Sequence, residues 1–185
     1  MKQDIVVRKS RVLRSLLFFA AIGGCSCVAA THAFGASDPG SCSANPESRQ
    51  LDYWLGDWTI SGPGASANAV SKVYATLDQC MIVESWDGGR GHKGRNMFAY
   101  SSDDKSWHGM FADNQGRVHV FQGKAASDAA EFVGPSRGAS GETDLNRIRI
   151  IRINPDKVEQ VWEKSTDNGA TWKEEFRGKY QRRKS

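Results

Sequence analysis

Four side chains combine the types and spacings of a small-molecule site. Glu84 and Trp86 lie two residues apart, and Trp107 and Phe111 lie four apart, so each pair faces one side if its segment is a β-strand. A carboxylate beside aromatic rings inside a barrel orients a ligand or acts as a buried general acid. On the outer face these would be ordinary surface groups, and the spacing does not choose between the placements. These four residues are our candidate ligand-binding residues.

Two glycine patterns match catalytic or cofactor motifs but lack the surrounding structure. Gly89–Gly94 has the G-x-G-x-x-G spacing of a dinucleotide site, which requires a helix after the glycines. Residues 95–100 have the composition of a strand, so we interpret the glycines as a hairpin loop. Gly134–Gly138 has the G-x-S-x-G spacing of a nucleophile elbow, but Ser136 is followed by a loop-forming sequence. We therefore predict no catalytic residue and no cofactor.

Three histidines follow residue 36, namely His92, His108 and His119. Their spacing matches no common zinc pattern, and no cluster of Asp, Glu or Cys accompanies them. We predict that they occupy surface or rim positions and that the chain has no metal site. A haem ligand in a barrel pocket is the alternative.

Short runs rich in β-branched and aromatic residues alternate with Gly, Asp, Asn and Pro clusters every eight to twelve residues, which is typical of all-β proteins. The predicted strands are Trp58–Ser61, Ala69–Leu77, Cys80–Trp86, Arg95–Ser101, Trp107–Ala112, Val118–Gly123, Glu131–Gly134, Leu145–Asn154, Lys157–Ser165 and Trp172–Arg182. Their short links favour hairpin pairing of consecutive strands. Ten such strands form an antiparallel up-and-down barrel or a sandwich, and we favour the barrel because closure removes exposed edges.

One predicted strand breaks the simple alternation. Ile148 and Ile150 share one parity, whereas Ile151 and Ile153 share the other. A β-bulge near residues 150–151 would place all four side chains inside the barrel. The alternative is a strand buried on both faces, and we favour the bulge.

The segment Ser165–Trp172 resembles the Asp-box of sialidase-type propellers at Ser165, Asp167, Gly169, Thr171 and Trp172. The resemblance implies a structural role, in which Asp167 caps turn amides, Gly169 adopts a positive φ and Trp172 covers the hairpin. Propellers repeat the box in each blade, and this chain has one copy. We therefore predict a well-formed hairpin and no glycosidase activity.

Residues 1–36 have the order of a secretory signal peptide, with basic residues, then the apolar run 16–22, then small residues. We predict cleavage near Ala33 or Ala36 and a periplasmic or secreted mature protein. Two alternatives remain open. Cys25 would be lipidated if 22–25 is a lipoprotein signal, or 16–34 would stay as an uncleaved anchor. Only these alternatives would attach the protein to a membrane.

Cleavage changes the charge of the protein. The leader carries five of the 25 Lys and Arg residues and one of the 21 Asp and Glu residues, which leaves 20 of each. Nucleic acid binding requires a basic face, and the remaining basic cluster is C-terminal: Arg177, Lys179, Arg182, Arg183 and Lys184. A solvated tail explains this cluster more simply, so we predict no nucleic acid partner.

Cleavage also leaves two cysteines, Cys42 and Cys80, in an oxidising compartment. We predict a disulfide between them, with two free thiols as the alternative. Residues 37–49 are rich in Ser, Pro and Asn and are predicted to be a linker or tail. Residues 50–185 then form a single barrel domain.

The segment Gln50–Trp58, with the sequence QLDYWLGDW, resembles the opening signature of a family of exported bacterial proteins without an assigned function. The resemblance extends over about residues 42–181. The family is lipocalin-like, and Gly56-Asp57-Trp58 is similar to the Gly-x-Trp that opens the first calycin strand. This implies structural roles for Gly56 and Trp58, with Arg177 or Arg182 covering the indole.

The chain departs from the family pattern at one place. Where the pattern has Trp-x-Gln-x-Trp, this chain has Trp107-His-Gly109-Met-Phe111. By analogy of fold, the leading hypothesis is a binding module that holds a small, mostly apolar molecule in the barrel. The alternatives are an envelope interaction protein with a filled barrel and an enzyme that uses Glu84 or Asp113 with a nearby His.

Overall fold

The computed structural model describes residues 41–184, apart from residues 64, 138–140 and 142. The predicted signal peptide, its cleavage site and the lipidation alternative at Cys25 lie outside the described residues. Within the described part of the chain, no helix has the length and apolar character needed to cross a membrane.

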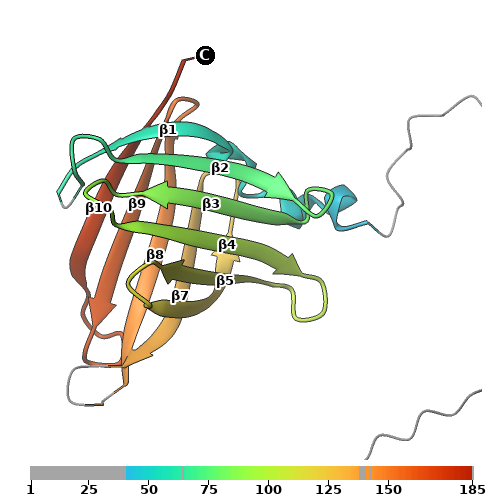
Figure 1. The fold of residues 1–185 in the computed structure, drawn as a ribbon. Coiled ribbons are helices and arrows are strands. Elements are labelled where there is room, and N and C mark those ends of the chain that lie inside the picture. The colour runs from blue at the N-terminus through green and yellow to red at the C-terminus, as the bar shows by residue number, and fades with distance from the viewer. Residues whose placement is uncertain (1–40, 64, 138–140, 142, 185) are drawn as a thin grey trace, which may run out of the picture. The chain divides into compact units, whose positions relative to one another are not determined.

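Ten antiparallel strands form a closed barrel in which each strand pairs with its neighbour in sequence and β1 pairs with β10 (Figure 1). The strands are β1 Gly56–Ser61, β2 Val70–Thr76, β3 Met81–Asp87, β4 Lys93–Ser101, β5 Ser106–Asp113, β6 Val118–Ala125, β7 Ala129–Arg137, β8 Thr143–Asn154, β9 Lys157–Ser165 and β10 Lys173–Arg182. The predicted up-and-down barrel is confirmed, and the sandwich alternative is wrong.

Alternate side chains of each strand point into the barrel. Ile148 and Ile150 are fully buried, Ile151 is half-buried and Ile153 is 53% exposed. The register between β7 and β8 is regular through Ile150 and Ile151. The predicted bulge at residues 150–151 is therefore wrong, because alternation continues to Ile151. The ladder to β9 shifts register further along, between Arg152 and Asn154, and Ile153 stays exposed near the end of the strand.

Strand β7 continues through Pro135, although the predicted strand stopped at Gly134. Pro135 is in register with Leu145 of β8, whereas the ladder between β6 and β7 covers only residues 122–125 and 130–133. Pro135 therefore lies beyond the ladder to β6, where its missing N–H group costs no hydrogen bond.

An N-terminal segment closes one end of the barrel. It consists of three 3-10 helices, Cys42–Ala44, Pro46–Arg49 and Asp52–Trp54. Trp54 is fully buried, and its ring contacts Phe98 and Tyr180 at centroid distances of 6.1 and 6.4 Å. The predicted disulfide between Cys42 and Cys80 is confirmed and ties this segment to the turn between β2 and β3. We call this side the closed end.

The closed end also contains the Gly-x-Trp residues. The Arg182 guanidinium lies over the Trp58 ring at 4.2 Å and donates a 2.7 Å hydrogen bond to the Leu55 carbonyl oxygen. Gly56 has a φ of +134°, and a Cβ there would collide with Arg182. Arg177, the other candidate cover, instead pairs with Glu159 and Glu174.

The C-terminal basic residues do not form a solvated tail. Arg177, Lys179 and Arg182 belong to β10, the strand that closes the barrel against β1. Only Arg183 and Lys184 follow this strand in the described chain. The interpretation as a tail was wrong because Arg177 and Lys179 alternate with the buried positions Gly178 and Tyr180, and Arg182 lies over Trp58.

The Ser165–Trp172 segment forms the turn between β9 and β10. Asp167 accepts hydrogen bonds from the Thr171 amide and hydroxyl at 2.8 and 2.5 Å. Gly169 has a φ of +90°, and its amide donates to Ser165 Oγ at 2.8 Å. The Arg147 guanidinium lies 4.2 Å from the centre of the Trp172 ring. The turn therefore has the interactions that the Asp-box resemblance implied.

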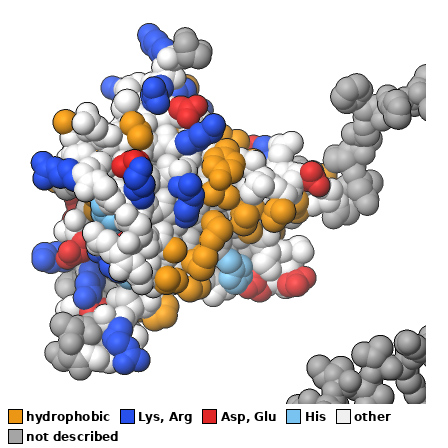
Figure 2. Space-filling view, in the orientation of Figure 1, with side chains coloured by type: hydrophobic (Ala, Val, Ile, Leu, Met, Phe, Trp, Pro, Cys, Tyr) orange, Lys and Arg blue, Asp and Glu red, His pale blue; other side chains and the backbone are white. Residues whose placement is uncertain are grey.

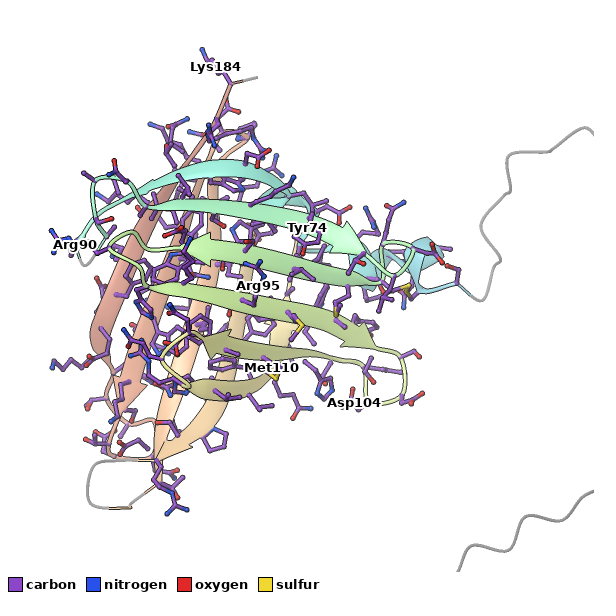
Figure 3. All side chains as sticks on the ribbon, in the orientation of Figure 1. Tyr74, Arg90, Arg95, Asp104, Met110 and Lys184 are labelled. Atoms are coloured by element: carbon purple, nitrogen blue, oxygen red, sulfur yellow. A yellow bond between two sulfur atoms is a disulfide. The ribbon has the colours of Figure 1, made fainter. Side chains whose placement is uncertain are left out.

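The outer face of β2–β6 carries a row of apolar side chains. The residues in register across the five strands are Tyr74, Val83, Met97, Met110 and Val120. They form part of the hydrophobic band in Figure 2, and Figure 3 labels Tyr74 and Met110 on this face. Tyr74 and Val120, at the two ends of the row, are 40% and 60% exposed.

Candidate functional site

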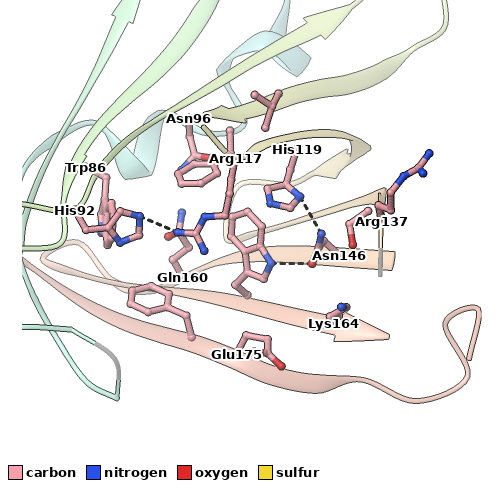
Figure 4. A pocket seen from close by; sticks show the side chains of 15 residues that line it. Trp86, His92, Asn96, Arg117, His119, Arg137, Asn146, Gln160, Lys164 and Glu175 are labelled. Carbon is pink, nitrogen blue, oxygen red and sulfur yellow. Dashed lines mark hydrogen bonds between the residues drawn. The ribbon is translucent and has the colours of Figure 1, made fainter. Parts of the chain in front are cut away.

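The barrel has a cavity of about 670 Å³ at the end opposite the 3-10 helices, which we call the open end. Its size lies within the usual range for small-molecule sites. Figure 4 shows the lining side chains, which come from β3–β10 and adjoining turns. They are Trp86, His92, Asn96, Phe111, Arg117, Val118, His119, Ser136, Arg137, Asn146, Gln160, Trp162, Lys164, Glu175 and Phe176.

Aromatic rings form much of the cavity wall. Phe111 and Trp162 meet edge to face at 5.3 Å, and Trp86 meets Phe176 in the same way at 6.3 Å. Phe111 lies against Gly94 of the neighbouring strand, where a Cβ atom would come within 2.5 Å of the ring. The glycine therefore leaves the space that lets this ring lie flat on the strand.

The structure brings only part of the predicted set to the cavity. Trp86 and Phe111 line it, whereas Glu84 lies buried beneath its floor. Trp107 is 2% exposed in the core and donates from Nε1 to Gln50 Oε1 at 3.1 Å, away from the cavity. Gly109, which stands where the family pattern has Gln, faces Phe98, and a Cβ there would lie 2.5 Å from that ring.

Glu84 is the centre of a polar cluster that crosses the barrel below the cavity. Its Oε1 accepts 2.8 Å hydrogen bonds from Ser71 and from Tyr180. Its Oε2 accepts from Asn96 at 2.6 Å and from Gln160 at 3.4 Å. Burial raises the pKa of Glu84, although these hydrogen bonds oppose the shift. Burial, together with the neighbouring Glu84, also raises the pKa of Tyr180.

Two buried polar atoms beside the cavity have no partner among the described residues. Asn96 is 3% exposed and donates to Glu84, but its Oδ1 accepts no hydrogen bond among the described residues. Trp86 Nε1 is likewise buried and without an acceptor in this part of the chain. Both residues line the cavity. A buried polar atom without a partner is costly, so these atoms favour a ligand or water molecule at the floor.

A hydrogen-bonded chain on the opposite wall fixes the tautomer of His119. The Trp162 indole can only donate, and it donates to Asn146 Oδ1 at 3.1 Å. Asn146 Nδ2 must therefore donate to His119 Nδ1, which lies 3.0 Å away. Burial and the nearby Arg117 charge lower the pKa of His119. The neutral ring then carries its proton on Nε2, beside the cavity (Figure 4).

The rim carries a charged cluster. His92 Nε2 lies 2.9 Å from Asp113 Oδ2, and Arg117 Nε donates to the same oxygen at 2.7 Å. Burial acts to raise the pKa of Asp113, but these contacts and two backbone amides hold it below its usual value. On the facing strands, Lys164 Nζ lies 2.6 Å from Asp144 Oδ2. Arg137 also lines the cavity and pairs with no described residue.

Sequence reasoning placed the histidines at the surface or rim. His108 is exposed and bonds Asp104, and His92 lies at the rim. His119 instead lines the cavity between Phe111 and Trp162. His119 lies two residues before the buried Phe121 on β6, so both side chains face the interior, and this spacing could have indicated the position of His119. Among the described residues, no three His, Cys, Asp or Glu side chains are placed to hold a metal ion.

The cavity also contains Asn146, Arg117, Arg137 and Lys164, which sequence reasoning did not select. Asn146 has the parity of the buried residues on β8, and Lys164 has the parity of Gln160 and Trp162 on β9. Polar residues on one strand face carry no sign of a ligand by themselves.

No protein-family model matches this chain, and a search of curated proteins finds no significant match.

Proposed function

We propose that the protein is a binding module that holds one small, mostly apolar molecule in the cavity at the open end of its barrel. The supporting observation is a cavity of about 670 Å³ that combines aromatic walls with two buried polar atoms, Asn96 Oδ1 and Trp86 Nε1, that no described residue satisfies. Aromatic walls with a few directed polar groups are the usual composition of small-molecule sites.

The two alternatives receive less support. A filled barrel acting through its surface requires a packed interior, whereas a cavity of about 670 Å³ remains at the open end. An enzyme based on Glu84 requires a reacting atom to reach its carboxylate, which is 0% exposed and accepts four protein hydrogen bonds. Asp113 does pair with His92, but Arg117 and backbone amides also occupy that carboxylate.

The proposal includes export to the periplasm or outside the cell, and no nucleic acid partner. Support comes from the signal-like order of residues 1–36 and from the Cys42–Cys80 disulfide, which is typical of oxidising compartments. The N-terminus of the protein isolated from its host tests this part. A mature chain that begins near residue 34 or 37 is expected, and a chain that begins at Met1 would contradict cleavage.

Native mass spectrometry of the protein purified from its host tests ligand binding. We expect a bound small molecule in the wild type and in Val120→Trp, which adds bulk on the outer face. Ser136→Trp places an indole in the cavity, and we expect it to lose the ligand. If wild-type protein carries no small molecule and no member of a lipophilic panel shifts its melting temperature, the proposal fails.

A further inference from the structure

The lining of the cavity indicates the chemical class of the molecule that fits it. Four aromatic side chains, Trp86, Phe111, Trp162 and Phe176, come from four strands and present edges and faces to the same space. His119 adds a fifth ring, close to parallel with Phe111 at 26° and 6.3 Å. Rings that meet one another edge to face leave faces and edges on which a further planar ring can stack.

The charged groups at the rim are mainly cationic. Three cations line the cavity, namely Arg117, Arg137 and Lys164, and the one carboxylate among the lining residues is Glu175. Glu175 is exposed, and its Oε1 lies 3.5 Å from Lys173 Nζ. Arg117 already binds Asp113, and Lys164 already contacts Asp144. Arg137 is the lining cation that no described residue neutralises. An anionic group on a ligand would therefore be attracted to the side of the rim that carries Arg137.

His119 adds a directed donor on that same side. Asn146 occupies Nδ1, so the Nε2–H group of the neutral ring is the donor left beside the cavity. Figure 4 shows His119, Asn146, Arg137 and Lys164 on one side of the pocket, with Trp86 and His92 on the other. His119, Asn146 and Lys164 therefore lie along one wall, with Arg137 at its exposed outer rim, and a ligand would present acceptor oxygens to this side.

The floor of the cavity presents a hydrogen-bond acceptor, whereas the wall presents donors. Asn96 Oδ1 is a buried acceptor that no described residue satisfies, although its Nδ2 is held by Glu84. The amide of Asn96 is oriented by Glu84, because Nδ2 donates to Glu84 Oε2 at 2.6 Å and Oδ1 therefore points away from that oxygen. A ligand group that reaches the floor needs an N–H or O–H to donate to Asn96.

We propose that the cavity takes a planar aromatic acid, with its rings against Trp162 and Phe111, its anionic group toward Arg137 and His119, and a hydrogen-bond donor toward Asn96. This inference rests on the proposed function and narrows its ligand class. A carboxylate, sulfonate or phosphate would supply the same anionic chemistry.

Two fluorescent probes that differ by one group test the inference. 1-Anilinonaphthalene-8-sulfonate and N-phenyl-1-naphthylamine share three aromatic rings and one N–H donor, and only the first carries an anion. We expect wild-type protein to bind the sulfonate about tenfold more tightly than the neutral probe, because Arg137 at the rim and the His119 donor both favour the anion. Naphthalene-2-carboxylate should displace the sulfonate probe, and naphthalene-2-methanol should not.

Matched variants assign the effect to the cavity. Arg137→Glu should weaken sulfonate binding by about fivefold or more while leaving neutral-probe affinity within about twofold. Arg183→Glu makes the same charge change beyond β10 at the closed end and should alter neither affinity. Ser136→Trp should reduce the binding of both probes, which separates the cavity from the apolar outer row.

The outcomes separate the two proposals. Equal affinities for the two probes, or equal effects of Arg137→Glu and Arg183→Glu, overturn the aromatic-acid inference and leave a binding module standing. Loss of the sulfonate preference in Asn146→Leu, with an unchanged circular dichroism spectrum, supports the role of His119. If neither probe binds, the aromatic-acid inference falls, and the binding module falls with it only if native mass spectrometry and the lipophilic panel also find no ligand.

Discussion

Glu84 shows how a carboxylate can lie in the middle of a barrel core. Its two oxygens accept four hydrogen bonds from side chains on four other strands, so burial leaves neither oxygen without a donor. These bonds connect β2, β4, β9 and β10 around β3. Because all four hydrogen bonds are formed, Glu84 holds its neighbouring side chains in place, above all Asn96 at the cavity floor.

The raised pKa of Glu84 predicts a pH dependence of stability. As the pH rises past about 4.5, the ordinary pKa of Glu, the unfolded chain loses this proton while the folded protein retains it. The free energy of unfolding then falls by about 1.4 kcal/mol per pH unit until the folded-state pKa is passed. Urea denaturation from pH 4 to pH 8 measures this fall as the difference between wild type and Glu84→Gln.

Glu131→Gln is the control, because that carboxylate is exposed on the outer face of β7. The difference in the free energy of unfolding between wild type and Glu131→Gln should not fall as the pH rises. A flat difference for Glu84→Gln over the same range would contradict the prediction.

Arg182 gives a second prediction for a single residue. Its guanidinium stacks on Trp58 and donates to a backbone carbonyl of the closing segment. Lysine keeps the charge but cannot form this planar stack and hydrogen bond together. We expect Arg182→Lys to lower the free energy of unfolding by about 1–2 kcal/mol in urea titrations. Arg183→Lys should have little effect, and equal effects of the two changes would refute this role.

Residue type alone predicted part of the site. Trp86 and Phe111 were found because aromatic residues in strands commonly face a core or a cavity. Trp107 has the same chemistry but lies nearer the closed end, where its ring fills the core beside Tyr100. Depth along a barrel depends on strand tilt and register, which neighbouring residues do not reveal. For the same reason, the pairing of Asn146 with His119 across two strands was not foreseen.

At the scale of elements, the three 3-10 helices depend on their covalent tie. The disulfide closes a loop between Cys42 and Cys80, with a sequence separation of 38 residues. The chain-entropy model assigns a loop of this length about 4 kcal/mol of stabilisation. We expect the double variant Cys42→Ser, Cys80→Ser to lose up to this amount in urea denaturation. Reduction of wild-type protein should reproduce the loss, and an unchanged transition midpoint would contradict it.

Strand positions followed closely from the alternation of turn and strand residues, whereas strand ends did not. The predicted strand 131–134 is five residues shorter than β7, because it omits residues 129–130 at the start and 135–137, including Pro135, at the end. Proline ends a strand only where its N–H is needed, and that depends on the partner strand. The prediction that all four isoleucines of β8 lie inside the barrel failed for a similar reason. Ile153 lies close to the turn at Asp156, where the strand leaves the core.

At the scale of the whole molecule, the barrel is divided along its axis. Aromatic and aliphatic side chains fill the closed end, the Glu84 cluster forms a polar layer, and the cavity lies beyond it. The sequence could predict closure, because ten consecutive hairpin-linked strands leave two edges that pair. It could not predict the cavity, because an empty volume results from side chains that do not meet across the lumen.

Strand β1 is the weakest point of the closed barrel, because both of its ladders are short. The ladder between β6 and β7 is equally short, but β6 and β7 each have a longer ladder on the other side. Strand β1 pairs with β10 only over residues 58–61 and with β2 only over residues 56–59, whereas β8 pairs with β9 from 145 to 154. Short ladders open at lower free energy than long ones. We therefore expect β1 amides to exchange with deuterium before those of β8 and β9, measured by mass spectrometry on the intact barrel.

Stapling this seam tests whether it controls opening. Thr59 and Gln181 are in register on the outer face, and a disulfide in Thr59→Cys, Gln181→Cys should slow exchange throughout β1. A control staple, Lys124→Cys with Glu131→Cys, joins register partners of β6 and β7 and should leave β1 exchange unchanged. Equal slowing by both staples would mean that the barrel opens as one cooperative unit, and the seam would then have no special role.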